Sequence, residues 1–215
     1  MENNNYADMI KIMQDIKLSS LVNGVQLNNL YGLAWFKSHY TDTAIYLDTG
    51  TNVGNSAIVM ASALKHQKLP KPVKVYTVDD FQYGDFNYDS SVDRDSAIAK
   101  AKYNLSQFGI DDIIEFHVEN DLDFINSLPD HTLDMVFDDS GHTYKETFDR
   151  LCAYIPKMND NSLILVHDYY VNFYPVIKAV NDFKKKFNDI VLEYGVIEGM
   201  SCLLYNVTTD AKGGK

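Results

Sequence analysis

Short apolar runs alternate with amphipathic segments of helical spacing along most of this chain. The apolar runs, rich in β-branched and aromatic residues, lie at residues 44–47, 73–78, 113–118, 133–137 and 163–166. The segments between them, where apolar residues recur every three or four positions, are residues 55–66, 95–108, 121–127 and 143–155. Strands that alternate with helices predict βαβ units, and therefore an α/β fold whose parallel sheet is covered on both faces.

The first forty residues are predicted to be helical instead. Apolar side chains recur at helical spacing in two groups, which are Tyr6, Met9, Ile10, Met13 and Ile16, and then Leu27, Leu30, Tyr31, Ala34 and Trp35. Asn23-Gly24 between the groups predicts a turn. We expect residues 1–41 to form a helical cap packed beside or over the sheet.

The last part of the chain also departs from the alternation. A long helix is predicted over residues 171–187. Residues 190–194 and 201–207 flank Gly195 and Gly199 and predict two antiparallel strands joined as a hairpin. We expect a single domain over residues 1–207, with the α/β core at 42–207 and a flexible tail at 208–215.

The composition excludes several classes of function. A chain of 215 residues fits one domain with a substantial core, and a formal charge of −11 argues against binding to nucleic acid. Two cysteines form no disulfide framework or metal-binding spacing. No apolar run approaches the roughly 20 residues that span a bilayer, and the polar N-terminus carries no signal core. We expect a cytoplasmic protein away from membranes, and a homodimer is compatible with the sequence.

Residues 46–56 predict a strand, a tight turn and a helix. The strand ends in Asp48, and Gly50 and Gly54 follow before the helical spacing begins. Glycines allow positive φ and close approach of a ligand, and the helix start offers free N–H groups. This is not the dinucleotide fingerprint, because Asp48 stands where its first glycine is required. The stretch therefore predicts a site for a small ligand with a cationic or hydroxyl-rich portion, and an ordinary turn without a ligand is the alternative.

Polar residues follow each of the five predicted parallel strands. They are Asp48, Asp79-Asp80, Asn120-Asp121, Asp138-Asp139 and His167-Asp168. Each alone could cap a helix or lie in a solvated loop. Because ligands of open parallel sheets bind beyond the carboxyl ends of the strands, we expect the series to line one cleft. Asp79 is placed to accept hydrogen bonds from ribose hydroxyls. Asp121, or its neighbour Asn120, could border a purine amine.

The motif at residues 137–144, Phe-Asp-Asp-Ser-Gly-His-Thr-Tyr, carries the strongest chemical signal. His142 and Tyr144 follow Asp139 by three and five residues, and His167-Asp168 come from the neighbouring strand end. Two carboxylates and two imidazoles in one small volume favour acid–base chemistry or a divalent metal site. The alternative is that His142 and Tyr144 are structural residues at a helix start. Aromatic-rich loops at 80–93 and 169–174 flank the cleft and could serve as lids or specificity elements.

Taken together, the chain resembles class I S-adenosylmethionine (SAM)-dependent methyltransferases over residues 44–207. The motifs that carry the resemblance are Leu-Asp-Thr-Gly-Thr-Asn-Val-Gly-Asn-Ser at 47–56, Tyr-Thr-Val-Asp at 76–79, Asp-x-x-His-x-Tyr at 139–144 and Val-His-Asp-Tyr at 166–169. More narrowly, it is similar to the small-molecule branch of the macrocin and catechol O-methyltransferase types. The resemblance implies a Rossmann-like, mostly parallel sheet of seven strands in the order 3-2-1-4-5-7-6, with an antiparallel last strand.

The resemblance also implies roles for individual residues. Asp48, Gly50 and the turn after them, which includes Thr51, Gly54 and Ser56, would meet the methionine part of SAM. Asp79 would hold the ribose, and Asn120 or Asp121 would lie beside the adenine. Asp139 would border the cofactor, and in metal-dependent relatives the positions of Asp139, His167 and Asp168 bind magnesium. His167 stands where an acid is usual, which weakens a magnesium site or changes the metal preference.

The predicted reaction is methyl transfer to a hydroxyl of a small molecule, such as a sugar or secondary metabolite. Asp139 or His142 would act as the base, and Asp168 as a metal ligand or orienting group. One alternative is a non-heme iron hydroxylase on the same fold, with His142, His167 and one carboxylate as the iron ligands. Another is a homologue that binds the cofactor without turnover.

Overall fold

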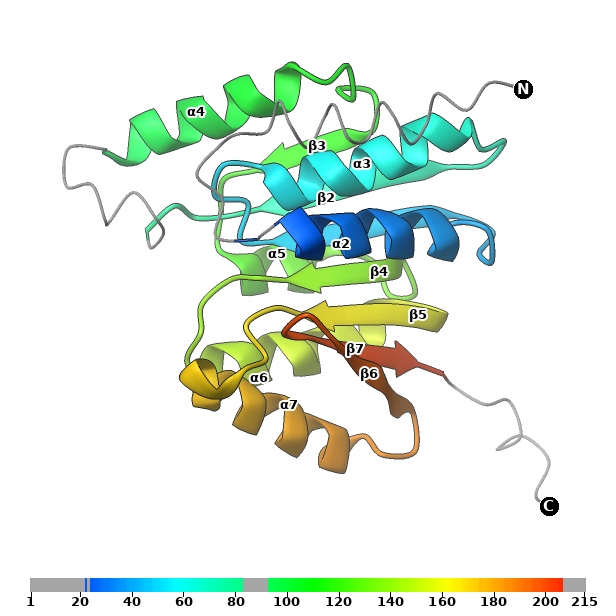
Figure 1. Cartoon of the computed structure of the whole chain (residues 1–215), viewed down its shortest axis with the longest axis vertical. Coiled ribbons are helices and arrows are strands. Elements are labelled where there is room, and N and C mark those ends of the chain that lie inside the picture. Colours follow the sequence, from blue (N-terminus) through cyan, green and yellow to red (C-terminus); the bar gives the residue numbers. More distant parts are fainter. Residues whose placement is uncertain (1–21, 23, 83–92, 207–215) are drawn as a thin grey trace.

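One seven-stranded sheet organises the molecule, with the strand order β3-β2-β1-β4-β5-β7-β6 (Figure 1). The computed structural model describes residues 22, 24–82 and 93–206. The strands are β1 (Ala44–Thr49), β2 (Val73–Val78), β3 (Ile114–His117), β4 (Leu133–Asp138), β5 (Met158–Val166), β6 (Val191–Ile197) and β7 (Met200–Tyr205). Neighbouring strands from β3 to β5 pair in parallel, and β7 runs antiparallel to both β5 and β6. The predicted fold class and strand order are therefore confirmed.

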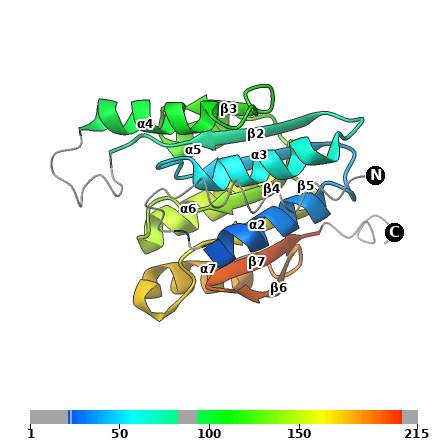
Figure 2. The same cartoon turned by 45° about the horizontal axis from the view of Figure 1, so that its top comes forward.

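Helices cover both faces of the sheet (Figures 1 and 2). They are α2 (Gly24–Lys37), α3 (Asn55–Gln67), α4 (Arg94–Ser106), α5 (Asp121–Ser127), α6 (Tyr144–Tyr154) and α7 (Tyr174–Lys186), with single 3₁₀ turns η2 (Ile155–Lys157) and η3 (Val171–Phe173). One buried cluster joins the sheet to α2, α3 and α4, and a second joins it to α5, α6 and α7. In β4, Phe137 packs in the first cluster and Val136 in the second, because successive strand side chains point to opposite faces.

Local sequence explains where several helices begin. Asp93 accepts a hydrogen bond from Ser96 N–H at the start of α4. At the start of α6, Thr143 and Glu146 form a reciprocal capping box. This cap places the start of α6 at Tyr144, the last residue of the 137–144 motif. Phe137 and Asp138 end β4, so residues 139–143 form the loop between β4 and α6.

Some predicted boundaries were wrong. Gly195 lies inside β6 at a shift of register, and the hairpin turn is formed by Glu198 and Gly199. β5 begins at Met158, five residues before its apolar run, because the polar stretch before Leu163 alternates too little to signal a strand. Helix α2 begins at Gly24, where a turn was predicted. The first helix of the predicted cap and the predicted tail lie outside the described residues. In the described part, no helix is long and apolar enough to cross a membrane.

Candidate functional site

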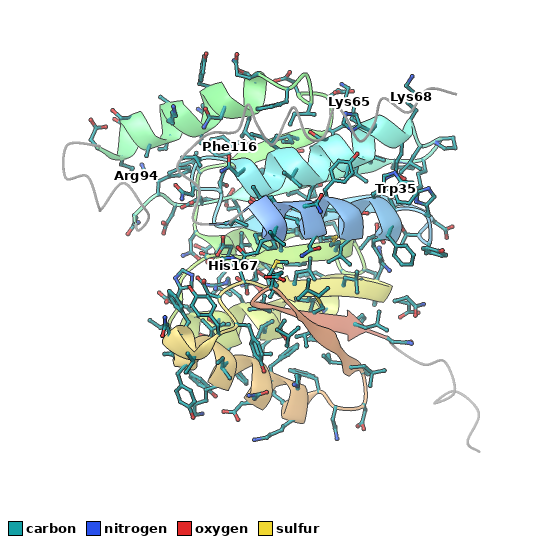
Figure 3. All side chains as sticks on the ribbon, in the orientation of Figure 1. Trp35, Lys65, Lys68, Arg94, Phe116 and His167 are labelled. Carbon is teal, nitrogen blue, oxygen red and sulfur yellow. The ribbon has the colours of Figure 1, made fainter. Side chains whose placement is uncertain are left out.

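The carboxyl ends of the parallel strands meet at one edge of the sheet, the left edge in Figure 1. Predicted site residues from every parallel strand end lie at this edge. His167, labelled in Figure 3, follows β5 directly. Asp48 is the fifth residue of β1, and Asp139 follows β4. The sheet therefore assembles side chains that are up to about 120 positions apart in the sequence, as the parallel topology predicts.

Asp48 is fully buried and only partly satisfied. The Thr77 hydroxyl donates to its Oδ2 at 2.7 Å, and the Thr51 and Thr77 hydroxyls are also 2.7 Å apart. Asp48 Oδ1 is buried and has no hydrogen-bond partner within the described part of the chain. Burial raises the pKa of Asp48 to about 7, although the hydroxyls of Ser56 and Thr77 oppose the rise. A buried acceptor without a partner is costly, so this oxygen is suited to a ligand donor.

Gly50 brings the turn after β1 against the loop after β4. Its φ is +89°, and a Cβ at this position would lie 2.2 Å from the backbone oxygen of Asp139. Asp139 N–H in turn donates to Thr49 O at 3.0 Å. Only glycine fits this approach and this backbone conformation. The turn that follows Asp48 and the loop that carries Asp139 are thus in direct contact.

Asp79 ties together the turns after β1 and β2. Its carboxylate accepts from Asn52 N–H at 2.9 Å and from Phe81 N–H at 2.7 Å. Burial raises the pKa of Asp79 to about 6, against the effect of these two backbone donors. Each carboxylate oxygen accepts more than one hydrogen bond, so Asp79 can still receive a hydroxyl.

Asn120 and Asp121 both have structural partners. Asn120 caps α5, and its side-chain oxygen accepts from Leu122 N–H at 3.0 Å. Asp121 Oδ2 lies 3.3 Å from Arg150 Nη1. Both residues lie at the start of α5, so the prediction that either Asn120 or Asp121 borders the adenine keeps both alternatives.

Arg150 is a site residue that sequence reasoning missed. It is buried in α6, donates from Nε to Asp138 Oδ1 at 2.9 Å, and donates from Nη2 to Gly141 O at 2.8 Å. It therefore pairs with two strand-end acids, Asp138 and Asp121, and supports the loop that carries Asp139. One feature of the sequence could have pointed to Arg150: the chain contains only two arginines.

Two carboxylates and two imidazoles converge beyond β4 and β5. His142 Nε2 lies 2.7 Å from Asp168 Oδ2 and 3.9 Å from Asp139 Oδ1. His167 Nδ1 lies 2.8 Å from Asp139 Oδ1 and 3.4 Å from Asp168 Oδ1. Despite these short distances, neither imidazole makes a hydrogen bond of proper geometry through these nitrogens to any described residue. The four side chains are paired electrostatically, but these imidazole nitrogens make no well-aligned hydrogen bond within the described residues.

The carboxylates and imidazoles of this cluster shift one another's pKa values against the effect of burial. Burial opposes the charged form of His142, but the carboxylates of Asp139 and Asp168 outweigh it and raise its pKa to about 9. The same balance, with Asp139 contributing most, raises the pKa of His167 to about 10. Burial disfavours the ionised form of Asp168, but His142 and His167 hold its pKa well below the usual range.

Three of the four side chains can share a metal ion. Donor atoms of Asp139, His142 and Asp168 all lie within 4.8 Å of one another. This set differs from the predicted ligands by having His142 in place of His167, which is more deeply buried behind Asp139. The carboxylate oxygens and one imidazole nitrogen fit a divalent cation chemically. Among the described residues, the set whose donor atoms meet in this way contains one imidazole, whereas the iron triad needs two.

The comparisons with known proteins assign the chain to a family. The sequence model of a family described as the methyltransferase domain matches residues 47–169, which include every predicted strand end from Asp48 to Asp168. The chain belongs to this methyltransferase family. No curated protein matches the sequence.

Solved O-methyltransferase structures share the fold of this methyltransferase. The structure of the O-methyltransferase NovP has a TM-score of 0.73 at 16% identity, covering 94% of this chain and all of that one. The O-methyltransferase TomG from Streptomyces achromogenes, in complex with SAM, has a TM-score of 0.63 at 18% identity, covering 96% and 92%. An O-methyltransferase from Bacillus cereus with bound SAH has a TM-score of 0.58 at 13% identity, covering 95% and 90%.

Aromatic side chains border the methyltransferase's acidic cluster, which consists of Asp139, Asp168 and the two imidazoles of His142 and His167. The Phe173 ring lies 5.0 Å from the His142 ring, and Tyr170 packs edge-on against Phe173 at 5.2 Å. Val171 and Tyr174, on either side, are exposed. The predicted aromatic loop at 169–174 therefore does flank the cluster. Residues 83–92 of the other predicted loop lie outside the described part.

Tyr144 points away from the cluster. Its hydroxyl donates to Asp182 Oδ2 at 3.2 Å, and Lys178 Nζ lies 4.2 Å from its ring centroid. Because α6 begins at this residue, its side chain falls on the helix face that packs against α7. The structural alternative thus describes Tyr144, whereas His142 faces the acids. The individual roles predicted for the site residues stay predictions.

Proposed function

We propose that this methyltransferase moves the methyl group of SAM to a hydroxyl oxygen of a small molecule. One observation carries the proposal: at Gly50, the turn that follows Asp48 contacts the loop with Asp139. A ligand held by the first loop would therefore present its reactive end to the cluster on the second. The O-methyltransferases of similar fold, including one with bound SAM, support this interpretation.

The first three strand ends supply the SAM site in this proposal. Buried Asp48 Oδ1 is a suitable acceptor for the ammonium group of the methionine portion. Thr51, Gly54 and Ser56 line the same turn and helix start. Asp79 is the acceptor for ribose hydroxyls, and Asn120 or Asp121 borders the adenine. When bound, SAM supplies a methyl group activated by the positive sulfonium.

The fourth and fifth strand ends supply the acceptor site. Asp139 takes the proton from the acceptor hydroxyl, because its loop is the one in contact with the SAM turn. The acceptor oxygen then forms its bond to the methyl carbon as the carbon–sulfur bond breaks. Asp139, His142 and Asp168 would hold a divalent metal, which would lower the pKa of the acceptor hydroxyl. His167 positions Asp139 from behind.

The acceptor is a ring-bearing hydroxylated molecule, such as a sugar or an aromatic secondary metabolite. Tyr170 and Phe173 offer ring faces and edges beside His142, where a flat ring can pack. Its hydroxyl would reach the acids, and its ring would rest on the aromatic pair.

Calorimetry with SAH and a methyl-transfer assay with labelled SAM test the proposal separately. Wild type should bind SAH, Asp48→Asn should bind it at least tenfold more weakly, and exposed Asp95→Asn should match wild type. Asp139→Ala should keep SAH binding but lose transfer to a panel of hydroxylated acceptors. No SAH binding by wild type would refute the donor site. Full turnover by Asp139→Ala would refute its role as the base.

A further inference from the structure

The hairpin turn between β6 and β7 contacts the segment that follows β5. It consists of Glu198 and Gly199, with φ of +49° and +81°, between the paired residues Ile197 and Met200. A two-residue loop with positive φ at both positions is the tight type I′ hairpin turn. Such a turn has little freedom, so its two carbonyl groups point in defined directions.

Both carbonyl groups of the turn have partners from distant parts of the chain. Gln26 Nε2, on α2, donates to Glu198 O at 2.8 Å across 172 positions of sequence. Tyr169 N–H donates to Gly199 O at 2.7 Å. A Cβ at Gly199 would lie 3.4 Å from the Tyr170 ring and 3.8 Å from Gln26 Nε2. The turn is thus clamped between α2 and the segment that follows β5.

Asp168 is the residue next to this clamp. Its φ is +54°, a left-handed conformation that is uncommon outside glycine, although aspartate adopts it more often than most residues. The N–H of the following residue makes the bond to Gly199, and Tyr170 N–H donates to Asp168 O at 2.9 Å. This backbone conformation places Asp168 Oδ2 2.7 Å from His142 Nε2. Support for Tyr169 is therefore support for the position of the carboxylate.

We propose that Gln26 is a positioning residue for Asp168 and acts through the Glu198-Gly199 turn. Gln26 is itself 6% exposed, so its amide is shielded from water. The proposal rests on the proposed function, because it gives Asp168 a role as a metal ligand. It adds α2 and the β6–β7 hairpin to the parts of the molecule that shape the site.

Mn²⁺ binding, followed by electron paramagnetic resonance, tests the proposal without a known acceptor. Gln26→Met keeps the length and burial of the side chain but removes the donor, and should weaken Mn²⁺ binding about tenfold, the lower end for the loss of a group that orients a ligand. Gln67→Met is the control for loss of a glutamine amide, since Gln67 Nε2 donates to a backbone carbonyl, Ala63 O, at 2.9 Å on α3, and its Oε1 accepts from the Ser38 hydroxyl at 2.8 Å. The control should bind Mn²⁺ like wild type, and both variants should keep wild-type affinity for SAH.

A crystal structure of the variant gives a second readout that needs no metal. Gln26→Met should show a longer contact between His142 and Asp168 and a shifted Tyr169–Gly199 bond, and Gln67→Met should show neither. Unchanged Mn²⁺ affinity with an unchanged contact would overturn the proposal. Should Gln26→Met fail to fold, Gln26→Leu, which is also apolar and also lacks the amide donor, takes its place. Absence of Mn²⁺ binding by wild type would count against the proposed metal role, while the contact would still decide the role of Gln26.

Discussion

Replacing Arg150 by methionine tests whether the buried ion pairs support the site. The Arg150 side chain is 3% exposed, and its partner Asp138 is 1% exposed, so neither group is solvated by water. The substitution removes both ion pairs and the bond to Gly141 O but retains an apolar stem of similar length. Asp138 would then be a buried carboxylate without its counter-charge.

The expected loss of stability is large. Removing one partner of a buried ion pair typically costs about 3–5 kcal/mol, because the other charge stays buried and uncompensated. At about 2–4 °C per kcal/mol for a chain of this length, the melting temperature should fall by about 10 °C. The loss should grow as the pH rises. Burial already raises the pKa of Asp138 against the charge of Arg150, so without Arg150 the folded state favours the protonated acid still more. The stability that protonated Asp138 contributes is fully present below the pKa of Asp138 in the unfolded chain and is lost above its pKa in the folded protein.

Urea unfolding of Arg150→Met at several pH values measures this loss. Lys145→Met is the control on the same helix, because Lys145 pairs with Asp149 at the surface, where its side chain is 85% exposed, and should unfold like wild type. Adding Asp138→Asn to Arg150→Met should recover part of the loss, since it removes the unpaired charge. Equal stability of Arg150→Met and the control at neutral pH would refute a supporting role for the ion pairs.

Three further predictions concern the loops of the site. In urea unfolding, Asp48→Asn should flatten the decline in stability between pH 4 and pH 7, and an unchanged slope would contradict this. Because the folded pKa of Asp48 is raised from 3.8 to about 7, its protonation contributes at most roughly 4 kcal/mol of stability, which is complete below pH 3.8 and lost by about pH 7. Gly50→Ala should abolish SAH binding in calorimetry and lower the free energy of unfolding more than Gly109→Ala does. Gly109 shares a positive φ, but a Cβ added there would meet no atom within 4 Å. Equal effects of the two substitutions would show that the contact with Asp139 is unimportant. Thr143→Ala should cost about 1 kcal/mol of unfolding free energy and Thr143→Ser much less, because only the alanine loses the cap of α6; equal losses would argue against the cap.

The periodicity of the sequence was enough to predict most of the fold and the edge that carries the site. Strand and helix periods are local properties, so β1, β2 and β4 and the helices between them were found within a few residues. Parallel strands place their carboxyl ends at one edge, so the meeting of Asp48, Asp139 and Asp168 there also followed. Where the pattern is weak, as in the polar start of β5, the boundary was missed.

Tertiary packing alone decided how the side chains at that edge are shared. Asp121 and Asp138 pair with Arg150, which lies inside a helix whose sequence does not reveal its partners. His142 faces the acids while Tyr144, two residues later, contacts α7, because the start of α6 separates their directions. Gln26 reaches the site through a turn 172 residues away. Such contacts depend on how elements far apart in sequence pack against each other, and the local periodicity of the sequence does not determine that packing.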